Sequence, residues 1–366
     1  MRLISVDVVK EGMQVGRTIW NEAGHPLLQK GVIITAGILR RLKQLNLQYI
    51  YIEDKFSDGI EIVETVSPEA RQKVVNSITS SFYAVRDANR ESASFILDQQ
   101  SKALGNIVDD LLNSILNSEE ILTVLTDAYM YDEYLYQHSF QVTLYSIAIA
   151  KELGYSYEDI RIIGIGAMLH DVGKLLIPPE IVMKPGRLTE EEYEIMKLHT
   201  KYGFDLLRNL HSVSLLVAHC AFQHHERLDG SGYPRGLTNI EIHPYAKIIG
   251  VADVFDAVTS NRVYREKMLP SQGMAIIQEG SGTLFVPEIV EALRRSIVHY
   301  PNGTTLLLSD GRRGVVCKQN SKVPDRPYVR IFEEEDLLVP VTYEIDLTQE
   351  QFVSIAKVEL DYVVTT

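Results

Sequence analysis

Short runs of apolar residues, separated by turn-forming residues, make up the first part of the chain. The runs at 15–20 and 48–52 are rich in β-branched and aromatic residues, which predicts strands. Between them, residues 36–45 carry Ile and Leu at intervals of three and four, the spacing of one helix face. Residues 1–65 are therefore predicted to form a small α+β module, in which we find no catalytic constellation.

A polar stretch at 66–120, almost free of Gly and Pro, follows this module. Ser67 and Pro68 suit the N-cap and the first position of a helix, and apolar stripes at helical spacing follow them. We expect one or two long connecting helices, which could form the contact of a homodimer or act as a signalling lever. A simple packing role is the alternative.

Helical spacing with embedded histidines continues through 121–300, and the pattern then turns β-rich for 301–366. Breaks rich in Pro and Gly interrupt the helical part. In the last part, strand-like runs flank a hairpin turn at Asp310 and Gly311. The predicted fold is mainly α, with a helical catalytic domain flanked by small β-rich N- and C-terminal modules.

Composition narrows the class of protein. The chain has 366 residues, of which 45% are hydrophobic and 23% are charged, as in ordinary globular proteins. A formal net charge of −13 argues against binding to nucleic acid polymers or membranes, although local cations could hold a small phosphorylated ligand. Cys220 and Cys317 lack CxxC partners, which fits a reducing compartment. Without a membrane span or a signal-peptide pattern, we expect a cytoplasmic protein.

An adjacent histidine and aspartate, His170 and Asp171, stand at the end of an apolar helical stretch, with Lys174 three residues further on. A bare carboxylate is costly to bury, and a metal ion removes that cost. Imidazole and carboxylate together suit Zn, Mn or Fe better than Ca or Mg. Taken alone, this stretch leaves a buried ion pair between Asp171 and Lys174 as the alternative.

Further candidate ligands lie in other apolar helical segments of the same region: His138, His199, the adjacent pair His224 and His225, and Asp253. Inward-facing side chains of this kind are typical of a metal site inside a helical bundle. Together with His170 and Asp171 they are too many for one tetrahedral ion, and they suit two ions, which Asp171 could bridge. Two metals a few Å apart suit in-line attack on a phosphodiester.

Other histidines in the chain have simpler interpretations. We assign ordinary core or loop roles to His211, His219, His243 and His299. Asp256 lies one helical turn after Asp253, so we expect it to support a ligand rather than to bind metal itself.

These residues carry a family resemblance. Over about residues 121–299 the chain resembles the HD-GYP family, a branch of the HD metal-dependent phosphohydrolases, through His170-Asp171, His199, His224-His225, the loop Gly230-Ser231-Gly232-Tyr233-Pro234, and Asp253. Many phosphohydrolases share the His-Asp pair, but few combine a double histidine with Gly-Tyr-Pro. The resemblance implies a bacterial phosphodiesterase that opens the signalling molecule cyclic di-GMP to linear pGpG, with GMP as an optional further product. It also implies two bound metal ions, with iron or manganese favoured.

The resemblance also implies residue roles. The seven candidate ligands named above would hold the metal ions, and Asp171 and Lys174 would be catalytic. Lys174 would face the scissile phosphate, and Tyr233 would line the guanine side of the pocket. Arg262 and Arg265 would hold phosphate, which suits their forked donors.

Two details of the motif carry further expectations. Gly230 and Gly232 should let their loop adopt positive φ, and Pro234 should stiffen its exit. Some family members hold a third ion with a glutamate four residues before the first ligand histidine, where this chain has Tyr134 before His138. A tyrosine hydroxyl is a poorer ligand because its usual pKa is near 10, so we expect two ions.

Two alternatives stay open at this point. One is an HD phosphohydrolase that acts on another nucleotide, against which the Gly-Tyr-Pro loop argues. The other is a non-catalytic receptor or scaffold that binds a cyclic dinucleotide and passes the signal through its flanking modules.

Overall fold

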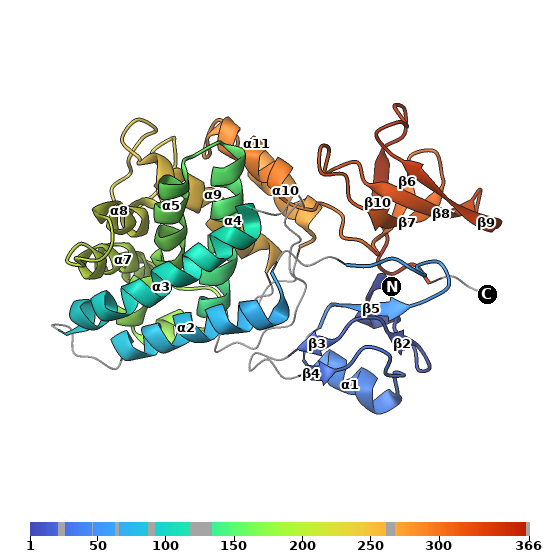
Figure 1. The fold of residues 1–366 in the computed structure, drawn as a ribbon, viewed down its shortest axis with the longest axis horizontal. Coiled ribbons are helices and arrows are strands. Elements are labelled where there is room, and N and C mark those ends of the chain that lie inside the picture. Colours follow the sequence, from blue (N-terminus) through green and yellow to red (C-terminus); the bar gives the residue numbers. More distant parts are fainter. Residues whose placement is uncertain are drawn as a thin grey trace.

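The computed structural model describes residues 1–20, 26–45, 47–62, 66–86, 92–116, 134–260 and 268–363, and it shows a helical body beside two β-rich modules (Figure 1). The described helices of the body are α2 (Pro68–Arg86), α3 (Ala93–Leu116), α4 (Tyr134–Glu152), α5 (Tyr157–Leu169), the 3₁₀ helix η3 (Val172–Leu176), α6 (Pro179–Val182), α7 (Glu190–Leu207), α8 (Leu215–Gln223), α9 (Pro244–Thr259), α10 (Pro270–Glu279) and α11 (Pro287–Ser296). The predicted mainly α fold is confirmed. Within the described ranges, no helix has the length and apolar character needed to cross a membrane.

Side-chain caps start several of these helices. Ser67 accepts a hydrogen bond from the backbone N–H of Ala70 over 3.2 Å, as its position before Pro68 predicts. At the start of α7, the hydroxyl of Thr189 accepts from the N–H of Glu192, and the Glu192 carboxylate accepts from the N–H of Thr189. This reciprocal pair satisfies two backbone donors that the helix leaves free, and it fixes where α7 begins.

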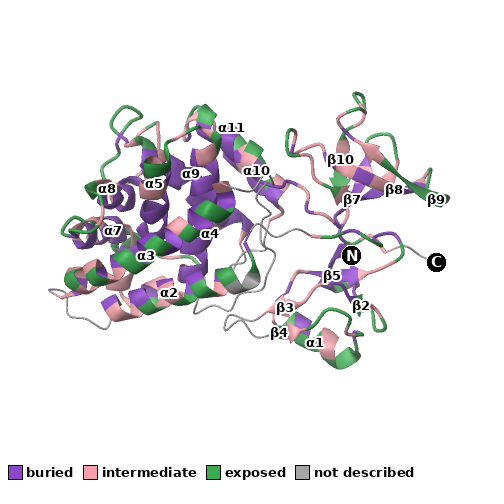
Figure 2. Cartoon of the chain, viewed as in Figure 1, coloured by how far each residue is buried: buried purple, intermediate pink, exposed green. Residues whose placement is uncertain are grey.

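One hydrophobic core fills the helical body, and it includes apolar side chains from α2 and α3 as well as from the helices that follow. Figure 2 shows buried residues concentrated along α4, α5 and α9, which lie inside the body. The apolar stripes of α2 and α3 therefore pack against the body of the same chain. An ion pair between Arg161 on α5 and Asp109 on α3, with 2.7 Å between N and O, joins the two layers.

The N-terminal module combines one helix with two small antiparallel sheets. Its elements are β1 (Arg2–Ser5), the 3₁₀ helix η1 (Val6–Val8), β2 (Gln14–Val15), β3 (Ile19–Trp20), β4 (Pro26–Leu28), α1 (Ala36–Gln44) and β5 (Tyr49–Glu53). The sheets have the orders β1-β5-β2 and β3-β4. The predicted strand at 15–20 is thus divided between both sheets. The division falls at Gly16, whose backbone lies so close to Met1 and Ile52 that a side chain would collide with them.

The C-terminal module is a five-stranded antiparallel sheet of order β10-β6-β7-β8-β9. Its strands are β6 (Thr305–Leu308), β7 (Arg313–Lys318), β8 (Tyr328–Glu334), β9 (Leu337–Asp346) and β10 (Ile355–Val358). The predicted hairpin turn between β6 and β7 is present, with Gly311 at φ 89°. A positive φ is the reason that this position suits glycine.

The two modules contact each other directly (Figure 1). The backbone N–H of Leu3 donates to the carbonyl of Gly303, and that of Ser5 donates to the carbonyl of Leu360, each over 2.9 Å. Leu3 and Leu360 are buried in a shared apolar cluster with Tyr51. The first and last parts of the described chain are therefore packed together.

Candidate metal centre

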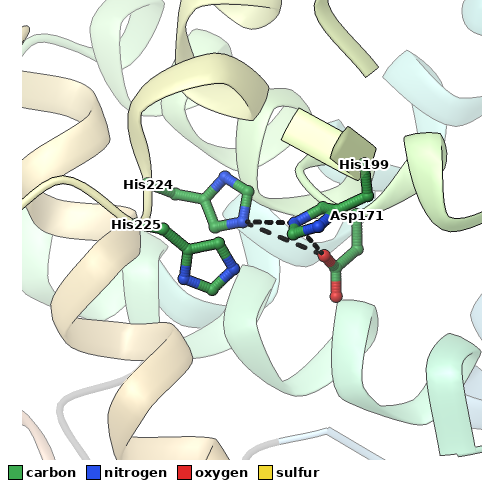
Figure 3. A group of neighbouring side chains, drawn as sticks. All are labelled: Asp171, His199, His224 and His225. Atoms are coloured by element: carbon green, nitrogen blue, oxygen red, sulfur yellow. Dashed lines mark hydrogen bonds and ion pairs between the residues drawn. The ribbon is translucent and has the colours of Figure 1, made fainter. Parts of the chain in front are cut away.

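Five helices bring the seven candidate ligands to one place: His138 from α4, His170 and Asp171 from the end of α5, His199 from α7, His224 and His225 from the end of α8, and Asp253 from α9. All are buried except His225, which is partly exposed. Figure 3 shows four of them, with Asp171 facing His199 and His224 while His225 lies beside His224.

Asp171 stands at the middle of this arrangement. Its Oδ1 lies 3.3 Å from Nε2 of His199 and 3.8 Å from Nε2 of His224. Its Oδ2 lies 3.3 Å from Nε2 of His170 and 3.6 Å from Nε2 of His138. The donors therefore form two groups that share Asp171, one with its Oδ1 and one with its Oδ2.

Asp253, on α9, lies near histidines of both groups. Its Oδ1 lies 3.1 Å from Nε2 of His138, and its Oδ2 lies 3.6 Å from Nδ1 of His225. Two carboxylates thus connect the histidines of one group with those of the other. Two buried carboxylates in this position need positive charge to compensate them, which bound cations would supply.

Hydrogen bonds to backbone carbonyls fix the orientation of three histidine rings. Nδ1 lies within 2.6–2.9 Å of a carbonyl oxygen in each case, pairing His170 with Ala167, His199 with Met196, and His224 with Ala221. A carbonyl oxygen only accepts, so each Nδ1 carries the proton and each Nε2 presents a lone pair to the centre. Histidines that bind metals are commonly held in this way.

Charge and burial set the protonation of the donors. Burial lowers the pKa of His199 to about 4 and lowers the pKa values of His224 and His225 well below the usual range, so these rings are neutral at pH 7. Burial alone would raise the pKa of Asp171, but neighbouring positive charge, first of all that of Lys174, holds that pKa well below its usual range. A neutral imidazole and an ionised carboxylate are the forms that bind metal ions.

His138 differs from the other rings because carboxylates lie on both of its sides. Burial alone would lower its pKa, but Asp253 and Asp256 together raise the pKa to about 9. Asp256 accepts from Nδ1 of His138, which directs Nε2 toward Asp171 and Asp253.

The donor set fits a transition-metal centre. Nε2 of His170 and Oδ1 of Asp171 are buried, and neither has a hydrogen-bond partner among the described residues. Such buried polar atoms are costly unless a cation meets them. Imidazole nitrogens mixed with carboxylate oxygens suit Zn, Mn or Fe. The residues could therefore hold metal in this position.

Close backbone contacts between helices allow the candidate ligands to approach one another. A Cβ on Gly173 would collide with the carbonyl oxygen of His199, so η3 can lie against α7 only with glycine there. A Cβ on Gly250 would lie 2.6 Å from the carbonyl oxygen of His224. These two glycines let the segments that carry Asp171 and His224 approach their neighbours closely. The sequence pattern drew attention to neither role.

The loop after His225 differs in part from expectation. Gly230 has φ 79°, as predicted. Gly232 does not have positive φ, and that prediction was wrong. It is needed for a different reason, because a Cβ at Gly232 would lie 2.5 Å from the backbone nitrogen of Arg227 and would also collide with the carbonyl of His225.

Glu226, which sequence reasoning missed, holds this loop in place. Its buried carboxylate accepts hydrogen bonds from the backbone N–H groups of Arg235 and Leu237, each over 2.8 Å. The loop then presents the ring of Tyr233 against His225, with ring centres 4.6 Å apart and planes at 27°.

Of the three residues expected to contact phosphate, only Lys174 lies within the described residues. Nζ of Lys174 donates to Oδ2 of Asp171, and the Lys174 side chain is 21% exposed. The ion pair named as the alternative for this stretch is therefore present within the histidine cluster. Arg262 and Arg265 lie outside the described residues.

The histidines given ordinary roles lie outside both donor groups. His243 caps α9 by accepting from the N–H of Tyr245, and His299 hydrogen-bonds the carbonyl of Arg294. His219 packs against Phe204.

Comparisons with known proteins agree with this geometry. A family model for the HD domain matches residues 124–289, and a model for a KOW domain associated with the HD domain matches residues 305–361. A cyclic di-GMP phosphodiesterase of Pseudomonas aeruginosa is 28% identical over 368 residues, covering 94% of this chain and 88% of the relative.

Two further relatives each match about half of the chain. A cyclic di-GMP phosphodiesterase of Thermotoga maritima is 42% identical over 199 residues, covering 54% of this chain and 53% of the relative. A 3'3'-cGAMP-specific phosphodiesterase of Vibrio cholerae is 38% identical over 170 residues, covering 46% of this chain and 37% of the relative. An HD domain thus covers residues 124–289, and its His-Asp pair, double histidine and Gly-Tyr-Pro loop lie around one centre, as expected from the resemblance to the HD-GYP family.

Proposed function

We propose that this protein hydrolyses cyclic di-GMP to linear pGpG, with GMP as the product of a second cleavage. The observation that carries the proposal is the shared position of Asp171, whose Oδ1 faces His199 and His224 and whose Oδ2 faces His138 and His170. The names of two relatives that match this chain, both cyclic di-GMP phosphodiesterases, support the choice of substrate.

The donors would hold two divalent transition-metal ions. Imidazole and carboxylate together suit Zn, Mn or Fe, and the family resemblance favours iron or manganese among these. His138, His170 and Asp171 would hold one ion. Asp171 with His199, His224 and His225 would hold the other, and Asp253 lies near histidines of both groups. Bound ions would supply an activated water and would stabilise negative charge on the phosphate during in-line attack.

The remaining side chains orient the substrate. Lys174 lies against Asp171 and is partly exposed, so its ammonium can meet the scissile phosphate at the edge of the centre. Arg262 and Arg265 contact phosphate, and Tyr233 lines the guanine side. In the reaction the oxygen of water joins phosphorus, the bond from phosphorus to the 3′ oxygen breaks, and that oxygen leaves as a hydroxyl.

A 3'3'-cGAMP hydrolase is the second candidate, because one relative of this chain is named for that substrate. A receptor without catalysis is less well supported. Six of the donors lie in two adjoining clusters, with Asp253 beside both. Three of the imidazoles turn Nε2 inward, which a receptor would not need.

A substrate panel tests the proposal. The metal-loaded full chain is incubated with cyclic di-GMP, 3'3'-cGAMP and cyclic di-AMP, and the products are separated by chromatography. We expect pGpG from cyclic di-GMP at the highest kcat/KM, and loss of all hydrolysis after chelation. Faster cleavage of 3'3'-cGAMP would favour the second candidate, and binding of cyclic di-GMP without any product would contradict catalysis.

A further inference from the structure

Two side chains on α7 lie beside Tyr233 and have not been discussed so far. The ring of Tyr193 meets the ring of Tyr233 edge-on, with centres 6.1 Å apart and planes at 82°. Nζ of Lys197, one turn after Tyr193, lies 5.4 Å from the centre of the Tyr193 ring and 6.0 Å from that of Tyr233. We call Tyr193, Lys197 and Tyr233 the α7 shelf.

The α7 shelf begins at the metal centre and leads away from it. The Tyr233 ring stacks on His225, and its centre lies 6.4 Å from that of His199. Lys197 precedes His199 by two residues on α7. Tyr193 lies one ring further from the centre and is 46% exposed. A ligand whose phosphate is at the centre would therefore have its nearest base beside this shelf.

The charge of Lys197 is available to a ligand. Its ammonium lies 2.7 Å from a carboxylate oxygen of Glu194, whose side chain is 69% exposed. Because Glu194 is open to solvent, its ion pair with the half-buried Lys197 contributes little, and Lys197 can exchange it for another acceptor. The two aromatic rings also attract the ammonium and keep it beside them.

We infer that the α7 shelf binds a purine base of the substrate, with Tyr193 stacking on the base and Lys197 donating to guanine. Aromatic side chains stack on bases of any kind. Lysine distinguishes guanine, because O6 and N7 of guanine both accept, whereas adenine presents an N6 amino donor at the same edge. The inference rests on the proposed function and deepens it, because it makes Lys197 a determinant of specificity for guanine.

Binding of mononucleotides tests this inference without turnover. Dissociation constants of GMP and AMP are measured by calorimetry with the metal-loaded full chain and its variants. The unaltered protein should bind GMP more tightly than AMP. Lys197→Met should reduce that preference by about 5–10-fold, whereas Tyr193→Ala should weaken both nucleotides by about 10-fold. Tyr193→Phe should retain both affinities.

Lys201→Met is the matched control, because Lys201 is an exposed lysine one turn later on α7 and should leave both constants unchanged. Equal affinity of the unaltered protein for GMP and AMP, or an unchanged preference in Lys197→Met, would overturn the shelf. Turnover of cyclic di-GMP is measured in parallel. Its absence, with the GMP preference intact, would overturn the proposed function and leave the shelf standing.

Discussion

Asp256 accepts a hydrogen bond from Nδ1 of His138 over 2.7 Å, and this bond determines which nitrogen of His138 faces the centre. The second oxygen of Asp256 accepts from the hydroxyl of Ser260 over 2.7 Å, which holds the carboxylate in place. Asp256 is fully buried one turn after Asp253 on α9. Asp256, which we expected to support a ligand rather than to bind metal, thus hydrogen-bonds the candidate ligand His138.

Replacing Asp256 should therefore weaken metal binding without removing a ligand. Loss of a partner of this kind costs about 10–100-fold in metal affinity. We expect Asp256→Ala to lose metal and activity together, while Asp256→Asn, whose side-chain oxygen can still accept from Nδ1, keeps more of both. Metal titrations of the two variants measure the difference. Equal affinity in Asp256→Ala and the unaltered protein would show that the bond has no such role.

Asp171→Asn tests the bridging position. We expect this variant to lose metal and nearly all hydrolysis. Loss of a partner behind the ligands lowers metal affinity about 10–100-fold, and loss of the bridging carboxylate should lower it further. Its helical circular dichroism should persist, since the surrounding core is unchanged. Asp205→Asn, an exposed aspartate on α7, is the matched control. If Asp171→Asn keeps the metal content and turnover of the unaltered protein, Asp171 does not bridge two ions.

Much of the fold could be predicted because its elements leave local patterns. The helix expected at 36–45 is α1 (Ala36–Gln44), and Ser67 caps α2 as its position suggests. Contacts between distant segments leave no such pattern. The hydrogen bond from Leu3 to Gly303 joins backbone groups 300 positions apart, and neither residue type indicates it.

The candidate site shows the same division. Residue types and spacing singled out the side chains that the structure brings together, because buried histidines and acids are conspicuous in apolar helices. Glu226 was missed because its partners are backbone N–H groups of the loop, which no side-chain pattern reveals. We explained the glycine at position 232 by positive φ, which was wrong. Close approach to the backbone of Arg227 selects glycine just as positive φ does, so the sequence cannot separate the two causes.

Gly232→Ala should displace the loop that carries Tyr233. The added Cβ would collide with the carbonyl of His225, so the loop must move and the Tyr233 ring must leave its stacked position. We expect a higher KM for cyclic di-GMP. Gly37→Ala in α1, where an added Cβ would make only ordinary contacts, should leave kinetics unaltered. An unchanged KM in Gly232→Ala would remove the loop from substrate binding.

Arg262→Ala tests the assignment of a phosphate contact outside the described residues. A hydrogen bond to a charged group contributes about 1.5–3 kcal/mol, so KM for cyclic di-GMP should rise about 10–100-fold. Metal content should stay the same, because Arg262 is not a ligand. Loss of metal in this variant would instead mean that Arg262 supports the fold of the centre.

The number of bound ions tests the central claim most directly. The donors form two groups around Asp171, and in the sequence Tyr134 replaces the glutamate with which, by the family resemblance, some members hold a third ion. Elemental analysis of anaerobically purified protein should give about two transition-metal ions per chain, the number that a two-metal phosphodiesterase requires. A reproducible value of about one or about three ions per chain would contradict the account.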